Sequence, residues 1–131
     1  MIALDTNVVV RLIVNDDARQ VAAARRLLDQ NILLLTTVVM ETEWVLRKTY
    51  KLSRDRIISS IETMCGLPQV SLLEPDVIEA ALDLYVMGLD LADALHLCSM
   101  PHPAKMATFD VDLEIGARKH FGPGRVIIPG R

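Results

Sequence analysis

The chain has 131 residues, of which 51% are hydrophobic and 24% are charged, and its formal net charge is −3. This composition predicts one compact globular domain over residues 1–131 and excludes an intrinsically disordered chain. The negative net charge gives no overall attraction to nucleic acid. A polyanionic partner would therefore need a local basic patch or a bound metal ion.

The chain reaches Asp5 before an apolar signal sequence could form, and its apolar stretches are too short to span a membrane. Cys65 and Cys98 stand far apart and belong to no CxxC pattern, which leaves zinc and redox motifs unsupported. We interpret them as buried free thiols. A reducing cytoplasm is the expected location.

Short apolar runs alternate along the chain with segments whose apolar residues recur at helical spacing. Strands alternating with helices predict βαβ units, and therefore an α/β fold with a largely parallel central sheet and helices on both faces. The expected strands cover residues 2–4, 32–35, 70–73, 105–109 and 125–128. The expected helices cover residues 8–14, a segment around 21–28 after the acids at 15–17, about 38–50, a segment capped by Ser53, a segment opened by Pro75, 91–100 and 111–121.

Asp5 and Asp110 each come directly after an expected strand. Corresponding ends of parallel strands lie at one edge of a sheet, so we expect these two carboxylates on the same side of the molecule. That edge is where open α/β sheets bind ligands. The alternative is that each aspartate only caps the helix that follows it.

Asp93 lies in the segment 91–100, which is apolar nearly all round and should be deeply buried. A buried aspartate without a partner would take up a proton, so a cation or an arginine is needed near it. Asp90 and His96 share its helical side at spacings of three. We interpret Asp90 as a helix cap and His96 as a hydrogen-bonded histidine of the same region, in preference to a metal ligand.

The expected helix at 38–50 offers two acids that point to nearly opposite sides. Glu43 has Arg47 one turn later, a spacing typical of a solvated surface pair. Glu41 lies between Val38 and Val45 and borders the apolar face. Periodicity therefore favours Glu41 as the buried, functional acid.

Three further residues adjoin these acids, each with two open interpretations. Asp112 either joins the acidic cluster or caps the last helix, whereas the hydroxyls of Thr6 and Thr108 either orient a carboxylate or water or have ordinary turn and strand roles. Scattered basic side chains near the motifs could hold a nucleic-acid backbone, although such residues are usually only a solvated surface. These are Arg11, Arg47, Arg54, Arg56, Arg118, Arg125, Lys48, Lys51 and Lys119.

Carboxylates without a matching set of His and Cys ligands favour Mg²⁺ or Mn²⁺ over zinc. The sequence has no P-loop, no glycine-rich dinucleotide loop and no Ser-His-Asp spacing. Such a metal site can generate hydroxide and neutralise charge at phosphorus. Metal-assisted phosphodiester hydrolysis is the reaction that fits these residues best.

Four acidic motifs occur in order along the chain and together resemble those of PIN-domain ribonucleases. Within that family the chain is similar to the VapC toxins of bacterial toxin–antitoxin pairs, over essentially its whole length. The motifs are Leu4-Asp5-Thr6-Asn7, Met40-Glu41-Thr42-Glu43-Trp44-Val45-Leu46, Ala92-Asp93-Ala94-Leu95-His96 and Thr108-Phe109-Asp110-Val111-Asp112.

The resemblance implies that Asp5, Glu41, Asp93 and Asp110 bind Mg²⁺ (or Mn²⁺) and activate water to cut single-stranded RNA. It also implies a homodimer and a small antitoxin that blocks the site, for which a basic residue inserted among the acids is the expected means. Where the family commonly has a glycine-containing turn after the third acid, this chain has the glycine-free segment 100–104.

Two other classes of protein compete with this interpretation. The first is a catalytically silent PIN-like domain that binds RNA or a partner as a scaffold, and the intact acid set argues against it. The second is a two-component receiver domain, which needs paired acids after its first strand and a lysine at the end of its last strand. The segments 5–7 and 125–129 provide neither.

Overall fold

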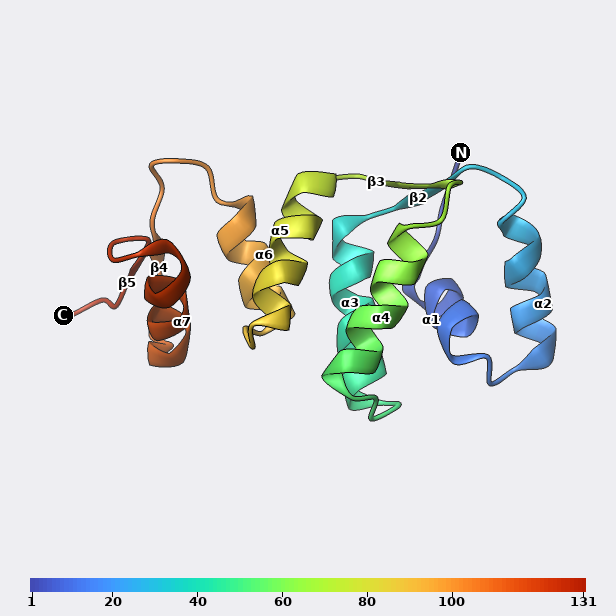
Figure 1. Cartoon of the computed structure of the whole chain (residues 1–131), viewed down its shortest axis with the longest axis horizontal. Coiled ribbons are helices and arrows are strands. Elements are labelled where there is room, and N and C mark those ends of the chain that lie inside the picture. Colours follow the sequence, from blue (N-terminus) through green and yellow to red (C-terminus); the bar gives the residue numbers. More distant parts are fainter. The chain divides into compact units, whose positions relative to one another are not determined.

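The structure is a computed structural model that describes residues 1–131, with seven helices and five short strands (Figure 1). The chain divides into two compact units, Met1–Asp76 and Val77–Arg131. Each unit is described by itself below. The helix α5 (Pro75–Val86) begins at the end of the first unit and continues into the second.

The first unit contains a three-stranded parallel sheet in the order β1-β2-β3, so that β2 is the central strand. In the register of this sheet, Ile32 lies opposite both Ile2 and Val70. The elements are β1 (Ile2–Ala3), α1 (Thr6–Val14), α2 (Ala18–Leu27), β2 (Ile32–Leu34), α3 (Thr36–Lys48), α4 (Arg54–Cys65) and β3 (Val70–Leu72).

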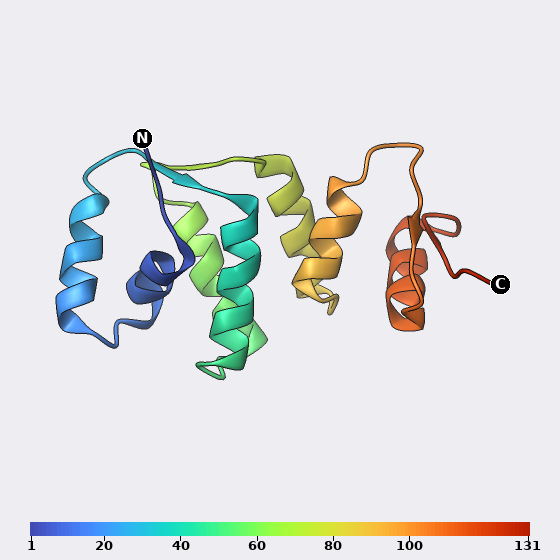
Figure 2. The same ribbon diagram turned by 180° about the vertical axis from the view of Figure 1, so that it is seen from behind.

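Aliphatic side chains from the sheet and the helices form the core of the first unit. Ile32 and Leu34 of the central strand are buried, as are Val10 of α1, Leu46 of α3 and Ile57 of α4. Helix α3 packs against α1 and α4, and the views from the front and from behind both show it beside α4 (Figure 1, Figure 2). Burial of these aliphatic groups is the main favourable contribution to the stability of the unit.

Helix caps in the first unit confirm the boundaries that the sequence predicted. The side chain of Asp17 accepts a hydrogen bond from the backbone N–H of Gln20 at 3.0 Å and begins α2. Ser53 caps α4 in the same way, accepting from the N–H of Arg56 at 3.3 Å. Each cap satisfies a backbone donor that the first turn of a helix leaves without a partner.

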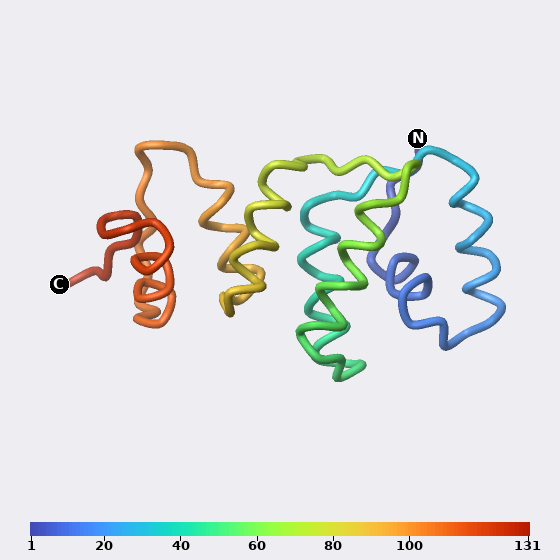
Figure 3. The backbone as a smooth tube through the Cα atoms, viewed as in Figure 1, coloured from blue at the N-terminus to red at the C-terminus, as the bar shows by residue number.

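The second unit contains a two-stranded parallel ladder in which Met106 lies opposite Val126. A small hydrophobic cluster joins α6, α7 and β5 through Leu97, Leu113 and Ala117 together with Val126. Figure 3 follows the backbone from α6 through the glycine-free segment 100–104 to β4. Besides α5, the elements are α6 (Leu91–Ser99), β4 (Met106–Ala107), α7 (Val111–Phe121) and β5 (Val126–Ile127).

The predicted α/β fold with parallel strands is confirmed, and every expected helix and strand is present. The five strands hydrogen-bond in two separate ladders, three strands in the first unit and two in the second. Helix α6 differs from the expectation of deep burial all round. Leu95 and Leu97 are buried, whereas Asp93 is half-buried and His96 is exposed, so one side of this helix is open.

The two cysteines are free thiols, as expected, but each is only half-buried. Burial still raises the pKa of the Cys65 thiol to about 11 and raises that of Cys98. No helix of the structure has both the length and the apolar character that crossing a membrane requires.

Candidate functional site

Asp5 occupies the junction between β1 and α1, where the sequence predicted it. It is the N-cap of α1, and its Oδ1 accepts a hydrogen bond from the backbone N–H of Thr6 at 2.8 Å. The side chain is exposed, and only Oδ1 takes part in this cap. Asp5 therefore caps α1, as the alternative interpretation expected. This cap holds the carboxylate at the start of the helix.

Asp110 has the same local role between β4 and α7. Its Oδ1 accepts hydrogen bonds from the backbone N–H groups of Asp112 and Leu113, at 3.0 and 3.2 Å. Its own N–H donates to the Thr108 hydroxyl at 3.0 Å. Asp110 thus begins α7, whereas Asp112 lies in the first turn of that helix and does not cap it.

Asp93 lies half-buried in the first turn of α6 among other acids. Asp90 caps this helix, as expected, and accepts from the backbone N–H of Asp93 at 3.2 Å. Burial raises the pKa of Asp93, and the charges of Asp90 and Asp110 raise it further, against an opposing effect of His96. The second unit therefore holds three carboxylates whose mutual repulsion bears on Asp93.

The donor set suits a hard divalent cation. Carboxylate oxygens are the ligands that Mg²⁺ and Mn²⁺ prefer, and a cation would relieve the repulsion that raises the pKa of Asp93. Asp5 and Glu41 belong to the first unit, whereas Asp93 and Asp110 belong to the second. Within either unit, no three His, Cys, Asp or Glu side chains are grouped to hold a metal ion. Convergence of all four acids on one ion stays a prediction.

The two glutamates of α3 differ from the sequence prediction in their burial. Glu43 is buried, with 2% of its surface exposed, and Glu41 is exposed. Arg47 donates to both carboxylate oxygens of Glu43, from Nε at 2.8 Å and from Nη2 at 3.4 Å. Glu43 shares its helix face with the buried Val39 and Leu46, which draw it into the core.

The prediction of a solvated Glu43 and a buried Glu41 was therefore wrong. A Glu–Arg pair at a spacing of four does not reveal whether it faces water. The choice of Glu41 as a ligand, which also rests on the family motif, stays a prediction. Its exposed carboxylate remains accessible to an ion.

Two buried threonine hydroxyls adjoin the acids. The Oγ1 atoms of Thr6 and Thr42 are inaccessible to solvent and have no hydrogen-bond partner. Thr6 follows Asp5, and Thr42 lies between the two glutamates of α3. The Thr6 hydroxyl therefore does not orient the Asp5 carboxylate, which is bonded by the Thr6 backbone N–H instead. Sequence reasoning did not single out Thr42.

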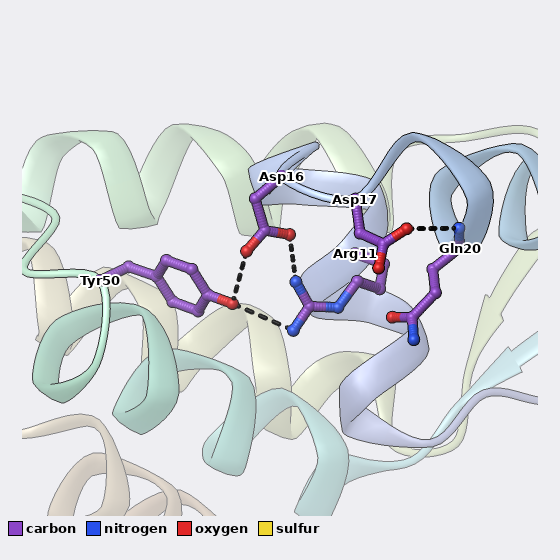
Figure 4. A network of polar contacts seen from close by, with 5 residues as sticks. All are labelled: Arg11, Asp16, Asp17, Gln20 and Tyr50. Atoms are coloured by element: carbon purple, nitrogen blue, oxygen red, sulfur yellow. Dashed lines mark hydrogen bonds and ion pairs between the residues drawn. The ribbon is translucent and has the colours of Figure 1, made fainter.

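Arg11, one of the basic residues near the motifs, has partners within the protein (Figure 4). It donates to Asp16 and, from Nη2, to the Tyr50 hydroxyl at 3.0 Å, while Tyr50 donates to Asp16 at 3.1 Å. These bonds lower the pKa of Asp16 and raise that of Arg11. The network joins the loop after α1 to the chain just after α3, so Arg11 has a structural role.

The family model of the PIN domain matches residues 2–118, which run across both compact units. The chain therefore belongs to the PIN-domain family, a family of nucleases that are typically metal-dependent. Neither a curated protein nor a solved structure matches the chain significantly.

Proposed function

We propose that this PIN domain is a metal-dependent endoribonuclease that cleaves single-stranded RNA in the cytoplasm. The observation that carries the proposal is the position of Asp93, which is partly desolvated and repelled by Asp90 and Asp110. Asp5, Glu41, Asp93 and Asp110 would hold Mg²⁺ or Mn²⁺. When bound, such an ion supplies charge neutralisation at phosphorus and lowers the pKa of water.

The contribution of the protein is to fix the carboxylates before substrate arrives. Asp5 and Asp110 are held by hydrogen bonds from helix N-termini, and the Asp90 cap fixes the turn that carries Asp93. Side chains held by such bonds lose little conformational freedom when they take up a ligand. The Thr108 hydroxyl adds to this by accepting from the backbone of Asp110.

Cleavage of an end-labelled single-stranded RNA tests the proposal. We expect products with Mg²⁺ or Mn²⁺, none in EDTA, and none from Asp93→Asn with metal. Asp83→Asn is the matched control, because Asp83 is an exposed aspartate on α5 of the same unit. Full activity after exhaustive chelation, or in Asp93→Asn, would contradict the proposal.

The alternative is a catalytically silent PIN-like domain that binds RNA or a partner as a scaffold. The presence of all four acids in the sequence favours the enzyme, because a scaffold role does not require the repulsion between carboxylates that acts on Asp93. If the domain is a scaffold, it should bind RNA without cleaving it at any metal concentration.

We further propose that the enzyme is the toxin of a type II toxin–antitoxin pair and works as a homodimer. The support is the ordered set of motifs that resembles VapC toxins. A small antitoxin would insert an arginine or lysine among the acids and occupy the position of the cation. Expression of the chain alone should arrest growth, and co-expression of the small protein encoded next to it should restore growth. No arrest and no binding of the neighbour would refute the toxin role and leave a housekeeping nuclease.

A further inference from the structure

The second unit contains a cavity of about 390 Å³ that the acidic residues do not line. Its walls come from two segments that follow helices. One is residues 102–105, between α6 and β4. The other begins at Phe121, the last residue of α7, and includes residues 123–125 between α7 and β5. This basic cavity includes part of the glycine-free segment 100–104.

The basic cavity carries positive charge in a chain that is negative overall. Lys105 and Arg125 line it together with His102, and no carboxylate does. Basic residues in the last turn of a helix commonly offset the helix dipole, which accounts for Arg118 and Lys119 in α7. That explanation does not extend to Lys105 and Arg125, because both lie outside helices.

Charge is separated along α7 as a whole. Asp110 caps its first turn, which carries Asp112 and Glu114. Its last turn carries three basic residues and ends at Phe121, which lines the basic cavity. A helix of 11 residues is about 16 Å long. This length corresponds to about five stacked nucleotides at roughly 3.4 Å each.

Arg125 is already held in place. Its Nη2 donates to the Leu97 carbonyl at 3.1 Å, and its guanidinium carbon lies 5.2 Å from the centre of the Phe121 ring. Its buried Nε has no hydrogen-bond partner. A guanidinium fixed in this way loses little freedom on binding phosphate. The residue Phe121 remains 41% exposed and offers apolar aromatic surface in the same cavity as the two cations.

We propose that the basic cavity binds the single-stranded RNA substrate at a distance from the cut, with phosphates on Lys105 and Arg125 and a base against Phe121. A cationic groove combined with an aromatic side chain is the chemistry by which proteins hold single strands without reading their sequence. This inference rests on the proposed function and names the surface that holds its substrate.

Binding measured without cleavage separates the two proposals. The probe is a fluorescein-labelled 12-nucleotide oligouridylate, followed by anisotropy with the full chain in EDTA. Lys105→Gln should weaken binding about threefold to tenfold, and it should reduce the slope of log affinity against log salt by about 0.7. Arg26→Gln is the matched control, because Arg26 is an exposed basic residue in the last turn of α2, and this variant should bind like the wild type.

A second variant tests the aromatic contact, and it avoids Arg125, whose bond to Leu97 contributes to the fold. Phe121→Leu should weaken oligouridylate binding by roughly fivefold or more. The same variant should bind inorganic polyphosphate, which has no bases, as tightly as the wild type does.

Equal binding by Lys105→Gln and Arg26→Gln would overturn the basic cavity as an RNA site. Competition by polyglutamate as strong as that by unlabelled RNA would also overturn it, because the cavity would then accept any polyanion. In both cases Mg²⁺-dependent cleavage by the wild type would leave the proposed function standing. A wild-type chain that neither binds the oligouridylate nor cuts RNA would refute both proposals together.

Discussion

Glu43 in the first unit and Asp93 in the second are both acids in apolar helices, yet their surroundings differ. Glu43 is almost inaccessible and receives two hydrogen bonds from Arg47. Asp93 is less buried, but the charges acting on it come mainly from other acids, and its pKa is raised. The comparison teaches that burial alone does not identify a functional acid. Electrostatic repulsion that the fold leaves unrelieved is the better sign.

The two sites should respond differently to loss of the carboxylate charge. Removing one member of a buried ion pair leaves its partner without compensation and destabilises the protein. Removing one acid from a group of like charges relieves repulsion and should not destabilise it. Substitutions at the two positions therefore sharpen the comparison directly.

The largest expected effect is on catalysis. Asp93→Asn should lower RNA cleavage at least about 100-fold, because it removes a ligand of the metal ion, and the bound ion supplies several kcal/mol of transition-state stabilisation. Asp5→Asn should do the same, and its fold should persist because asparagine caps helices as well as aspartate does. The measurements are the initial cleavage rate with Mg²⁺ and the melting temperature. Near-wild-type rates in either variant would remove the basis for a metal site.

The second prediction concerns Glu43, where we expect a loss of stability and no loss of activity. Glu43→Gln should lower the free energy of unfolding by about 1–3 kcal/mol, because it weakens the interaction with Arg47. Cleavage per folded molecule should remain close to that of the wild type. Urea denaturation followed by circular dichroism gives the stability, and the cleavage assay gives the activity.

Glu41→Gln is the matched control for that experiment, since the two glutamates lie on one helix. It should change stability by less than about 0.5 kcal/mol, because Glu41 is exposed. It should lose activity if Glu41 is the ligand. The opposite pattern, with Glu43→Gln inactive and Glu41→Gln fully active, would transfer the metal role to Glu43.

The third prediction concerns the cation itself. Mg²⁺ or Mn²⁺ should raise the melting temperature of the wild type by a few degrees, because an ion that binds only the native state stabilises it by mass action. Asp93→Asn should lose this response, whereas Glu43→Gln should keep it from its lower starting point. Thermal unfolding scans with stepwise addition of Mg²⁺ or Mn²⁺ measure the shift in melting temperature. An equal shift in all three proteins would indicate non-specific binding.

The sequence predicted the order of the elements correctly because each helix has a clear local signal. Asp110 begins α7 and Gly122 ends it, so the expected helix at 111–121 agrees with the observed one. The strands were harder. The expected strand at 105–109 shortens to Met106–Ala107, because pairing depends on the partner strand and not on the apolar run alone.

The site was predicted unevenly for the same reason. The caps at Asp5, Asp90 and Asp110 follow from neighbouring residues, and the sequence indicated the cap at Asp90 and offered capping as the alternative interpretation at Asp5 and Asp110. The burial of Glu43 depends on which face of α3 packs inward, and that is a tertiary property. The bond from Arg11 to Tyr50 joins residues 39 positions apart and has no local signal.

The smallest expected effect is a pH dependence of stability that arises from Asp93 in the absence of metal. The folded-state pKa of Asp93 is raised above its ordinary value of 3.8. A raised pKa means that the fold favours the protonated form of the carboxyl. The stability that Asp93 contributes to the folded state is therefore fully present below about pH 3.8, and it is lost as the pH rises through the raised value.

In EDTA, Asp93→Asn should therefore melt slightly above the wild type at pH 7, and this difference should shrink as the pH falls toward 4. Calorimetric scans of Asp93→Asn and the wild type at half-unit steps of pH give the comparison. A difference between Asp93→Asn and the wild type that is constant with pH would show that repulsion at Asp93 does not bear on stability.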